Sequence, residues 1–271
     1  MSKPNARKLV LGLLLASDGA PLEVKYAIAA CALFRITENS VRVTLARLCA
    51  DGLIRASGRG EYVIGPEGER LHAAVSEWRA AEQRVGTWQG RYVLVHIGPL
   101  PRGDRRAVLR RERALSLYGL RELERGLYVR PDNLVGGSPW LRERLLEVGL
   151  EPQAAVFTGD TFDAEREAYI STLWDGAALS SAYAEERERL EAWLSRRGEL
   201  DGDAAARESY LLGAAAIRRV VFDPWLPEPL VDVRARARFV ETVRRFDAAG
   251  RAIWREVAGG NTRMPLANPI G

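Results

Sequence analysis

The sequence predicts a multidomain protein of the α+β class. Three observations support this prediction: a helix followed by a glycine-rich hairpin within residues 34–64, strands alternating with helices between 91 and 158, and helices alone from residue 163 onward. A chain of 271 residues is long enough for two or three domains. The expected domains are a winged helix-turn-helix with a linker helix over 1–86, a ferredoxin-like domain over 87–160 and an all-helical domain over 161–271.

Three helices are expected in the first domain. Residues 7–16 form an apolar stretch, and a second amphipathic stretch covers 22–34. Thr37 is a suitable N-cap for a third helix over about 38–50, because its side-chain oxygen can accept from a backbone N–H of the first turn. Apolar residues of the third helix recur at the spacing of a stripe packed onto a core. These residues are Val41, Leu45 and Leu48.

A hairpin follows the third helix directly. Residues 53–57 and 61–64 alternate around Gly58-Arg59-Gly60, which is typical of a hairpin with a glycine-rich tip. The helix face opposite the apolar stripe is short, polar and basic, which suits entry into a DNA major groove. The pattern therefore predicts DNA binding, although the same arginines would also suit a merely solvated helix face. The candidate DNA-binding residues are Asn39, Ser40, Arg42, Val43, Arg47, Arg55 and Arg59.

The candidate residues have side chains that match particular DNA groups. Asn39 can pair with adenine, and Arg42 or Arg47 can pair with guanine. Val43 can meet a thymine methyl group. The arginines of the hairpin would hold phosphates or a minor-groove edge, which would position the helix without reading sequence.

The central domain is predicted from a change of pattern. A linker helix over 66–85, with Pro66 at its first position, precedes it. The segments that follow have the order β-α-β-β-α-β, which is that of a ferredoxin-like unit. We expect strands over 91–97, 120–123, 126–130 and 154–158, a helix over 104–118, and a helix over 140–148 capped by Ser138-Pro139.

Helices alone are predicted in the last domain, over 163–173, 176–196, 203–220 and 233–257. The last helix carries an apolar stripe at steps of four and three. We favour a core position for this stripe over a subunit interface. Its residues are Phe239, Val243, Phe246, Gly250, Ile253 and Val257.

Composition limits the classes of function. The net charge of +4 permits a nucleic-acid partner. No apolar run approaches the length needed to cross a bilayer. The apolar stretch near the N-terminus leads into a turn and another helix, so we expect a cytoplasmic protein with no membrane partner. The two cysteines, Cys31 and Cys49, are expected to be small buried thiols.

The residues needed for catalysis or metal binding are not arranged in a recognisable pattern. The two histidines, His72 and His96, do not lie near a cysteine pair, so no zinc spacing exists. The chain lacks a G-x-S-x-G motif, a phosphate-binding loop and a dinucleotide-binding fingerprint. We therefore expect no enzyme activity, no catalytic residues, no metal and no cofactor.

Several motifs, in order along the chain, resemble the PaaX family of bacterial repressors of phenylacetic acid catabolism. TENSVRVTLARLCADGLI resembles the N-terminal region of that family, and WQGRY at 88–92 resembles the start of its central domain. LYGL at 117–120, followed by GLYVRPDNL at 126–134, resembles its central motif. Further matches resemble its helical C-terminal domain. They are LWD at 173–175, IRR at 217–219 and FDPWLP at 222–227.

This resemblance implies a homodimeric transcriptional repressor of double-stranded operator DNA. It also implies an aryl-CoA effector such as phenylacetyl-CoA, and a central domain like that of the CRISPR-associated Cas2 proteins. Coenzyme A requires cations for its phosphates and an apolar slot for the aryl end. The candidate effector residues in or beside the family-like motifs are Trp88, Tyr128, Arg130, Trp174, Arg218 and Arg219. A salt bridge or plain core packing is the alternative role for each of them.

Two other functions remain open. A Cas2-like metal-dependent nuclease would need an aspartate at the end of its first strand. Here the strand ends in His96-Ile97-Gly98-Pro99, and the next acid is Asp104, beyond a proline-bearing loop. This makes the nuclease the weaker alternative. A DNA-binding repressor that needs no ligand fits the sequence as well.

Overall fold

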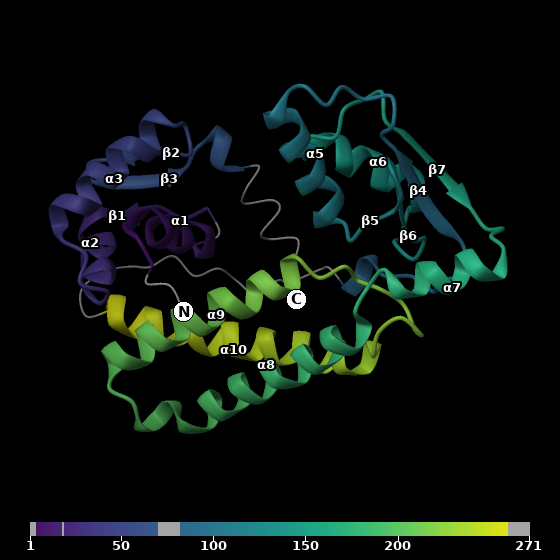
Figure 1. Ribbon diagram of the computed structural model, residues 1–271. Coiled ribbons are helices and arrows are strands. Elements are labelled where there is room, and N and C mark those ends of the chain that lie inside the picture. Colours follow the sequence, from purple (N-terminus) through teal and green to yellow (C-terminus); the bar gives the residue numbers. More distant parts are fainter. Residues whose placement is uncertain (1–3, 18, 70–81, 260–271) are drawn as a thin grey trace. The chain divides into compact units, whose positions relative to one another are not determined.

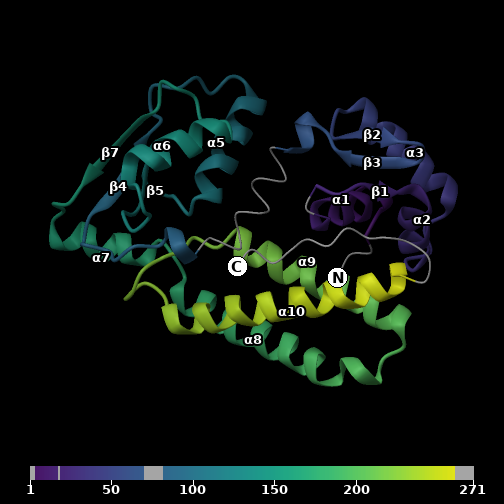
Figure 2. The same ribbon diagram turned by 180° about the vertical axis from the view of Figure 1, so that it is seen from behind.

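The computed structural model describes residues 4–17, 19–69 and 82–259. This part of the chain is a mixed α+β structure with small sheets and a helical C-terminal region (Figures 1 and 2), so the predicted class is confirmed. The chain divides into two compact units. Unit 1 comprises Met1–Arg79, Leu190–Ala216 and Val243–Gly271, and unit 2 comprises Ala80–Arg189 and Ile217–Thr242.

Unit 1 begins with three helices and a small antiparallel sheet. The helices are α1 (Ala6–Ala16), α2 (Val24–Ala32) and α3 (Glu38–Ala50), and the strands are β1 (Leu22–Glu23), β2 (Ile54–Gly58) and β3 (Glu61–Ile64). Strand β3 lies between β1 and β2. The three helices and the hairpin therefore occur in the predicted order.

One boundary in this region was predicted wrongly. Residues 22 and 23 were expected to open the second helix, but Leu22 pairs with Tyr62 and Glu23 pairs with Glu61 as a short strand. The helix begins only at Val24, whose backbone N–H donates to the Gly60 carbonyl at 2.8 Å. The partner strand lies far away in the sequence, so local periodicity does not reveal the pairing.

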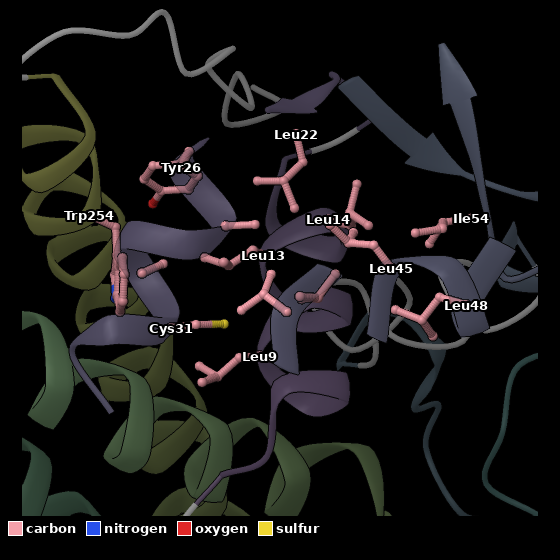
Figure 3. Close-up of a cluster of buried hydrophobic side chains, with 14 of the residues drawn as sticks. Leu9, Leu13, Leu14, Leu22, Tyr26, Cys31, Leu45, Leu48, Ile54 and Trp254 are labelled. Carbon is pink, nitrogen blue, oxygen red and sulfur yellow. The ribbon is translucent and has the colours of Figure 1, made fainter. Parts of the chain in front are cut away.

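The three helices share an apolar core with the last helix of the chain, α10 (Val233–Gly259) (Figure 3). Leu9 and Leu14 of α1, together with Leu45 of α3, are almost fully buried in it. Trp254 of α10 packs against the same cluster and is also buried. Burial of these side chains is the main favourable contribution to the stability of unit 1.

Unit 2 contains a four-stranded antiparallel sheet with the order β5-β6-β4-β7. The predicted succession of strands and helices is present, with each boundary shifted by only a few residues. The elements are β4 (Tyr92–His96), α5 (Arg105–Leu117), β5 (Arg121–Glu124), β6 (Leu127–Pro131), α6 (Gly137–Glu147) and β7 (Ala155–Gly159).

Helices α5 and α6 pack on one face of this sheet, and α7 (Ala164–Thr172) contacts the other. Val93 and Val95 of β4 pack against buried leucines of α5 and α6, including Leu115 and Leu141. Alternate residues of a strand point to opposite faces. On the other face the Tyr92 hydroxyl donates to Glu167 of α7 at 2.8 Å.

Two further predictions, on the cap of α6 and on the linker helix, have different outcomes. Ser138 was expected to cap α6, but the N-cap is Gly136, at a φ of 93°, and Ser138 lies inside the first turn. The Ser138 hydroxyl instead accepts a hydrogen bond from Thr158 of β7 at 3.1 Å. The linker helix begins at Pro66 as predicted, but most of its length lies outside the described residues.

Three long helices end the described part of the chain and contribute to both units: α8 (Gly176–Arg196), α9 (Gly202–Val221) and α10. The stripe predicted on the last helix lies in the core for the residues whose side chains are described. Phe239, Val243 and Phe246 are each no more than 1% exposed. Phe239 stacks on Tyr183 in unit 2, and Phe246 lies against Trp193 in unit 1.

Candidate nucleic-acid interface

Helix α3 packs against the core of unit 1 through one face, and its opposite face is exposed. The Thr37 side chain accepts from the Ser40 backbone N–H at 3.3 Å, which is the predicted N-cap. Val41, Leu45 and Leu48 are at most 2% exposed, so the predicted apolar stripe faces the core. Since one side of the helix is held this firmly, the opposite side is presented in a defined orientation.

All five predicted DNA-binding residues of α3 lie on its exposed side. Val43 is notable because this apolar side chain remains 41% exposed. The Ser40 hydroxyl lies 2.9 Å from the Thr37 hydroxyl and so takes part in the cap. The exposed residues are Asn39, Ser40, Arg42, Val43 and Arg47.

Arg42 has a local partner that was not predicted from the sequence. Its Nε and Nη2 atoms lie 2.8 and 2.7 Å from the same carboxylate oxygen of Glu38, one helical turn away. Both side chains are more than half exposed. An exposed pair of this kind is weak, so Arg42 can exchange the carboxylate for another anion or a base edge at small cost.

The hairpin places its two predicted arginines in solvent. Arg55 is exposed on β2, where its Cα lies opposite that of Val63, and Arg59 is exposed at the tip. Gly60 has a φ of 76°, a conformation that glycine adopts without strain, and this closes the turn. The hairpin thus carries two accessible cations directly after α3.

The predicted effector residues do not form one cluster. Arg130 is 1% exposed, and its guanidinium donates to the carbonyls of Pro131, Tyr118 and Pro224 and to the Asn133 side chain. Burial lowers the pKa of Arg130 to about 10. Its donors are therefore directed to protein acceptors.

Trp174 and Arg130 approach the same loop. The Trp174 indole N–H donates to the Gly119 carbonyl at 2.9 Å, next to the Tyr118 carbonyl that Arg130 contacts. A Cβ on Gly119 would lie 2.7 Å from Pro224, so this backbone approach requires glycine. Four of the family-like motifs thus meet at one buried junction within unit 2.

The other aromatic candidates lie on the two faces of the sheet. Tyr128 of β6 is partly buried in the core beneath α5 and α6, and burial raises the pKa of its hydroxyl. The half-buried Trp88 packs edge-on against Tyr92, with ring centroids 5.4 Å apart, and donates to the Arg91 carbonyl.

The two arginines near the end of α9 have more access to solvent. Arg218 is exposed and lies over the ring of Phe222, with its guanidinium carbon 4.9 Å from the ring centroid. Arg219 is partly exposed and lies 3.9 Å from a carboxylate oxygen of Glu186.

Sequence reasoning missed a second buried polar group in the same unit. The Tyr183 hydroxyl donates to Asp223 at 2.6 Å, and the Trp225 backbone N–H donates to the other carboxylate oxygen at 2.7 Å. Arg236 lies 3.9 Å from this carboxylate and donates to the Leu226 carbonyl. The FDPWLP motif was a signal for it, because an aspartate between apolar residues must find partners when it is buried.

Two kinds of feature were sought within the described ranges, metal-ligand clusters and membrane-spanning helices. No group of three or more histidine, cysteine or acidic residues is placed there to hold a metal ion. No helix in this part of the chain has both the length and the apolar character required to cross a bilayer.

The helices and the two small sheets define an α+β protein with a helical C-terminal region. Residues 174–256 match the family model of the PaaX-like protein C-terminal domain. This match confirms the resemblance inferred from the sequence for the helical C-terminal region, which is similar to the C-terminal domain of PaaX-like proteins.

Comparison with solved structures agrees on the fold. The uncharacterized protein Rv0674 from Mycobacterium tuberculosis is similar, with a TM-score of 0.66 and 21% identity over 94% of this chain and 99% of that chain. At this identity the similarity concerns the fold alone. No curated protein matches the chain.

Proposed function

We propose that the chain is a DNA-binding transcriptional regulator, and specifically a repressor of phenylacetic acid catabolic genes. The observation that carries the proposal is the exposed side of α3 followed by the basic hairpin. The helix order and the β1-β3-β2 sheet support a winged helix-turn-helix. Helix α3 is then the recognition helix, and the hairpin is the wing.

The same proposal assigns a ferredoxin-like, Cas2-like fold to the central region. Its support is the antiparallel strand order β5-β6-β4-β7, with two helices packed on one face. In this proposal the protein is a homodimer in the cytoplasm and acts by binding rather than by catalysis. Two copies of α3 then contact the half-sites of an imperfect palindrome.

We further propose that an aryl-CoA thioester such as phenylacetyl-CoA releases the protein from its operator. The exposed guanidinium of Arg218 and the partly exposed one of Arg219 suit the phosphates of coenzyme A. Trp88 and Tyr128 are candidates for the aryl group. Arg130 and Trp174 support the surrounding fold, since their donors are directed to protein carbonyls.

Operator binding measured by fluorescence anisotropy, on a duplex from the protein's own upstream region, tests the proposal. Phenylacetyl-CoA should weaken binding, whereas free phenylacetate, which lacks phosphates, should not. Linkage requires the operator to weaken thioester binding by the same factor, about 5–150-fold for a typical coupling. Equal affinity across a panel of acyl-CoAs would favour a repressor that needs no ligand.

Two variants test the assigned DNA contacts. Arg42→Ala should cost about 1–3 kcal/mol at one base position if this side chain reads a base edge. Arg59→Ala should weaken binding to all sequences and reduce the salt dependence by about one unit of slope. An unchanged slope would remove the hairpin from the interface.

A further inference from the structure

Helix α5 of unit 2 carries a row of exposed arginines that the proposed function does not use. Arg106, Arg110 and Arg113 are all exposed. Their spacing of i, i+4 and i+7 puts them on one face of the helix, over a length of about 10 Å. We call these three residues the α5 arginine row.

The opposite face of α5 is firmly held. Ala114 and Leu115 are each 1% exposed in the core of unit 2. Arg111, also in this helix, is 2% exposed and donates to both carboxylate oxygens of Glu151, at 3.0 and 2.5 Å. Asp104 caps the first turn by accepting from the Arg106 N–H at 2.8 Å. The arginine row is therefore displayed on a rigid support.

The charge of the row is not compensated within the described residues. Arg111 has its carboxylate, and exposed arginines of other helices have theirs, such as Arg166 with Glu124 and Arg196 with Glu208. For the row, no carboxylate within ion-pair distance is found among residues 4–17, 19–69 and 82–259. Like charges at i and i+4 destabilise a helix slightly. The row therefore lowers the stability of α5 by a small amount, and no ion pair within the described residues offsets this.

Two exposed neighbours extend the positive surface, because Arg102 and Arg105 precede the row. The apolar component of this surface is small: Leu109 is 41% exposed, whereas the main apolar face of the helix is buried in the core. A helix that inserts into a lipid surface requires that face to be free. The chemistry therefore favours a polyanion contacted through its charge alone.

We propose that the α5 arginine row binds the phosphate backbone of duplex DNA, as a second contact outside the base pairs that α3 reads. This inference rests on the proposed DNA-binding function. Arginine forks match phosphate geometry, and contacts of this kind add affinity without sequence preference. The row would thus increase the number of phosphates neutralised in the complex.

The test is the salt dependence of binding to a random-sequence duplex several helical turns long. Three variants are compared with wild type by anisotropy, between about 50 and 200 mM salt. R106Q/R110Q/R113Q removes the row, and R55A/R59A removes the cations of the hairpin. R234Q/R238Q/R245Q is the matched control, because it removes the same charge from exposed positions of α10. Thermal unfolding curves establish that each variant is folded.

The row variant should lose about 2–3 units from the slope of log K against log salt, since each phosphate contact contributes about 0.9. The control should keep the wild-type slope. Equal losses of slope in the row variant and in the α10 control would overturn the inference, because the change in net charge alone would then explain both losses. An unchanged slope in the row variant, with a loss in R55A/R59A, would overturn it while the proposed function stands.

Three other results separate the inference from the proposed function. Failure of the wild-type protein to bind duplex DNA would overturn both. A loss confined to the row variant would support the row and count against the hairpin as a DNA contact. Poly-glutamate binding that requires the row, with DNA binding that does not, would assign the row to an acidic protein and overturn the inference.

Discussion

The two units attach their N-terminal and central parts to the helical C-terminal region by different chemistry. In unit 1 the helices α1–α3 meet α9 and α10 through aromatic packing, whereas in unit 2 the central region meets residues 222–227 through buried hydrogen bonds. Aromatic packing depends on contact area and tolerates small shifts. Buried hydrogen bonds fix one arrangement, because each donor and acceptor must be matched.

The unit 1 attachment centres on Tyr210 of α9. Its ring lies edge-on to Phe34, with centroids 5.5 Å apart, and edge-on to Trp254, at 6.4 Å. A Cβ on Gly12 of α1 would lie only 3.3 Å from the Tyr210 hydroxyl oxygen, so the helix approaches closely. The polar component is small: the Tyr210 hydroxyl donates to the Lys8 carbonyl at 3.2 Å.

The unit 2 attachment uses donors that have no access to water. Arg130 reaches Pro224, and the Asn133 amide donates to the Trp225 carbonyl at 2.7 Å. Both side chains are at most 2% exposed. Losing one partner here leaves another group buried and unsatisfied, which is more costly than losing a surface contact.

Trp254→Ala should have the largest effect, about 3–5 kcal/mol, because it removes a buried indole and leaves a cavity. Cys31 reports on this region, since its thiol is fully buried and burial raises its pKa to about 11. Labelling of Cys31 by a thiol reagent in native buffer should accelerate about a hundredfold or more. Tyr169→Ala, at a site 51% exposed in unit 2, is the control; an equal acceleration there would contradict the local assignment.

Arg130→Met should cost about 2–4 kcal/mol in urea denaturation, because three carbonyls and the Asn133 side chain lose a buried donor. Arg130→Met should accelerate Cys31 labelling less than Trp254→Ala does, because the hydrogen bonds that it removes lie in unit 2. Arg125→Met, at an exposed arginine of the same unit, should stay within about 0.5 kcal/mol of wild type. Similar losses in both methionine variants would show that the buried bonds contribute little.

The contrast between apolar packing and buried hydrogen bonds also explains which features could be predicted from the sequence. The α3 stripe and the stripe of α10 follow from local periodicity, because burial repeats along one helix face. The exposed positions of the candidate DNA-binding residues follow from the same period. Strand β1 and the Gly136 cap were missed, because they depend on backbone pairing with distant residues or on a glycine conformation.

The polar junction of unit 2 was less predictable. Arg130 was read as a candidate cation for a ligand, yet its acceptors come from carbonyls as far away as Pro224. Arg111 did have a local signal, because it shares a face with Ala114 and Leu115 at i+3 and i+4. Its partner Glu151 lies beyond α6 and cannot be inferred from spacing.

Acid should affect unit 2 through Glu151. The Arg111 guanidinium hydrogen-bonds to this carboxylate and holds its pKa below the usual range. A depressed folded-state pKa contributes stability above the unfolded value, near 4.3, that is lost as the pH falls through the folded value. Arg111→Met removes the contribution, about 2 kcal/mol.

The difference in unfolding free energy between wild type and Arg111→Met should therefore shrink from about pH 7 to pH 3. Urea denaturation across that range is the measurement. Arg113→Met, at an exposed position two residues further along α5, is the matched control and should show no such change. If the difference in unfolding free energy stayed constant with pH, the cost of Arg111→Met would not arise from the lost interaction with the Glu151 carboxylate.

The smallest effect on stability is expected at the exposed ion pair of α3, where the contrast with the buried junction is sharpest. Glu38→Gln should change the unfolding free energy by less than about 0.5 kcal/mol, because both side chains of the Glu38–Arg42 pair are exposed.

The effect of Glu38→Gln on DNA binding should nevertheless be measurable. The substitution frees the Arg42 guanidinium and removes a negative charge beside the proposed DNA-contacting face, so affinity should rise about 2–5-fold. Glu188→Gln, an equal charge change at an exposed position of α8, should leave anisotropy titrations unchanged. Equal gains in the two variants would mean that net charge acts at long range and that the Glu38 pair does not restrain Arg42.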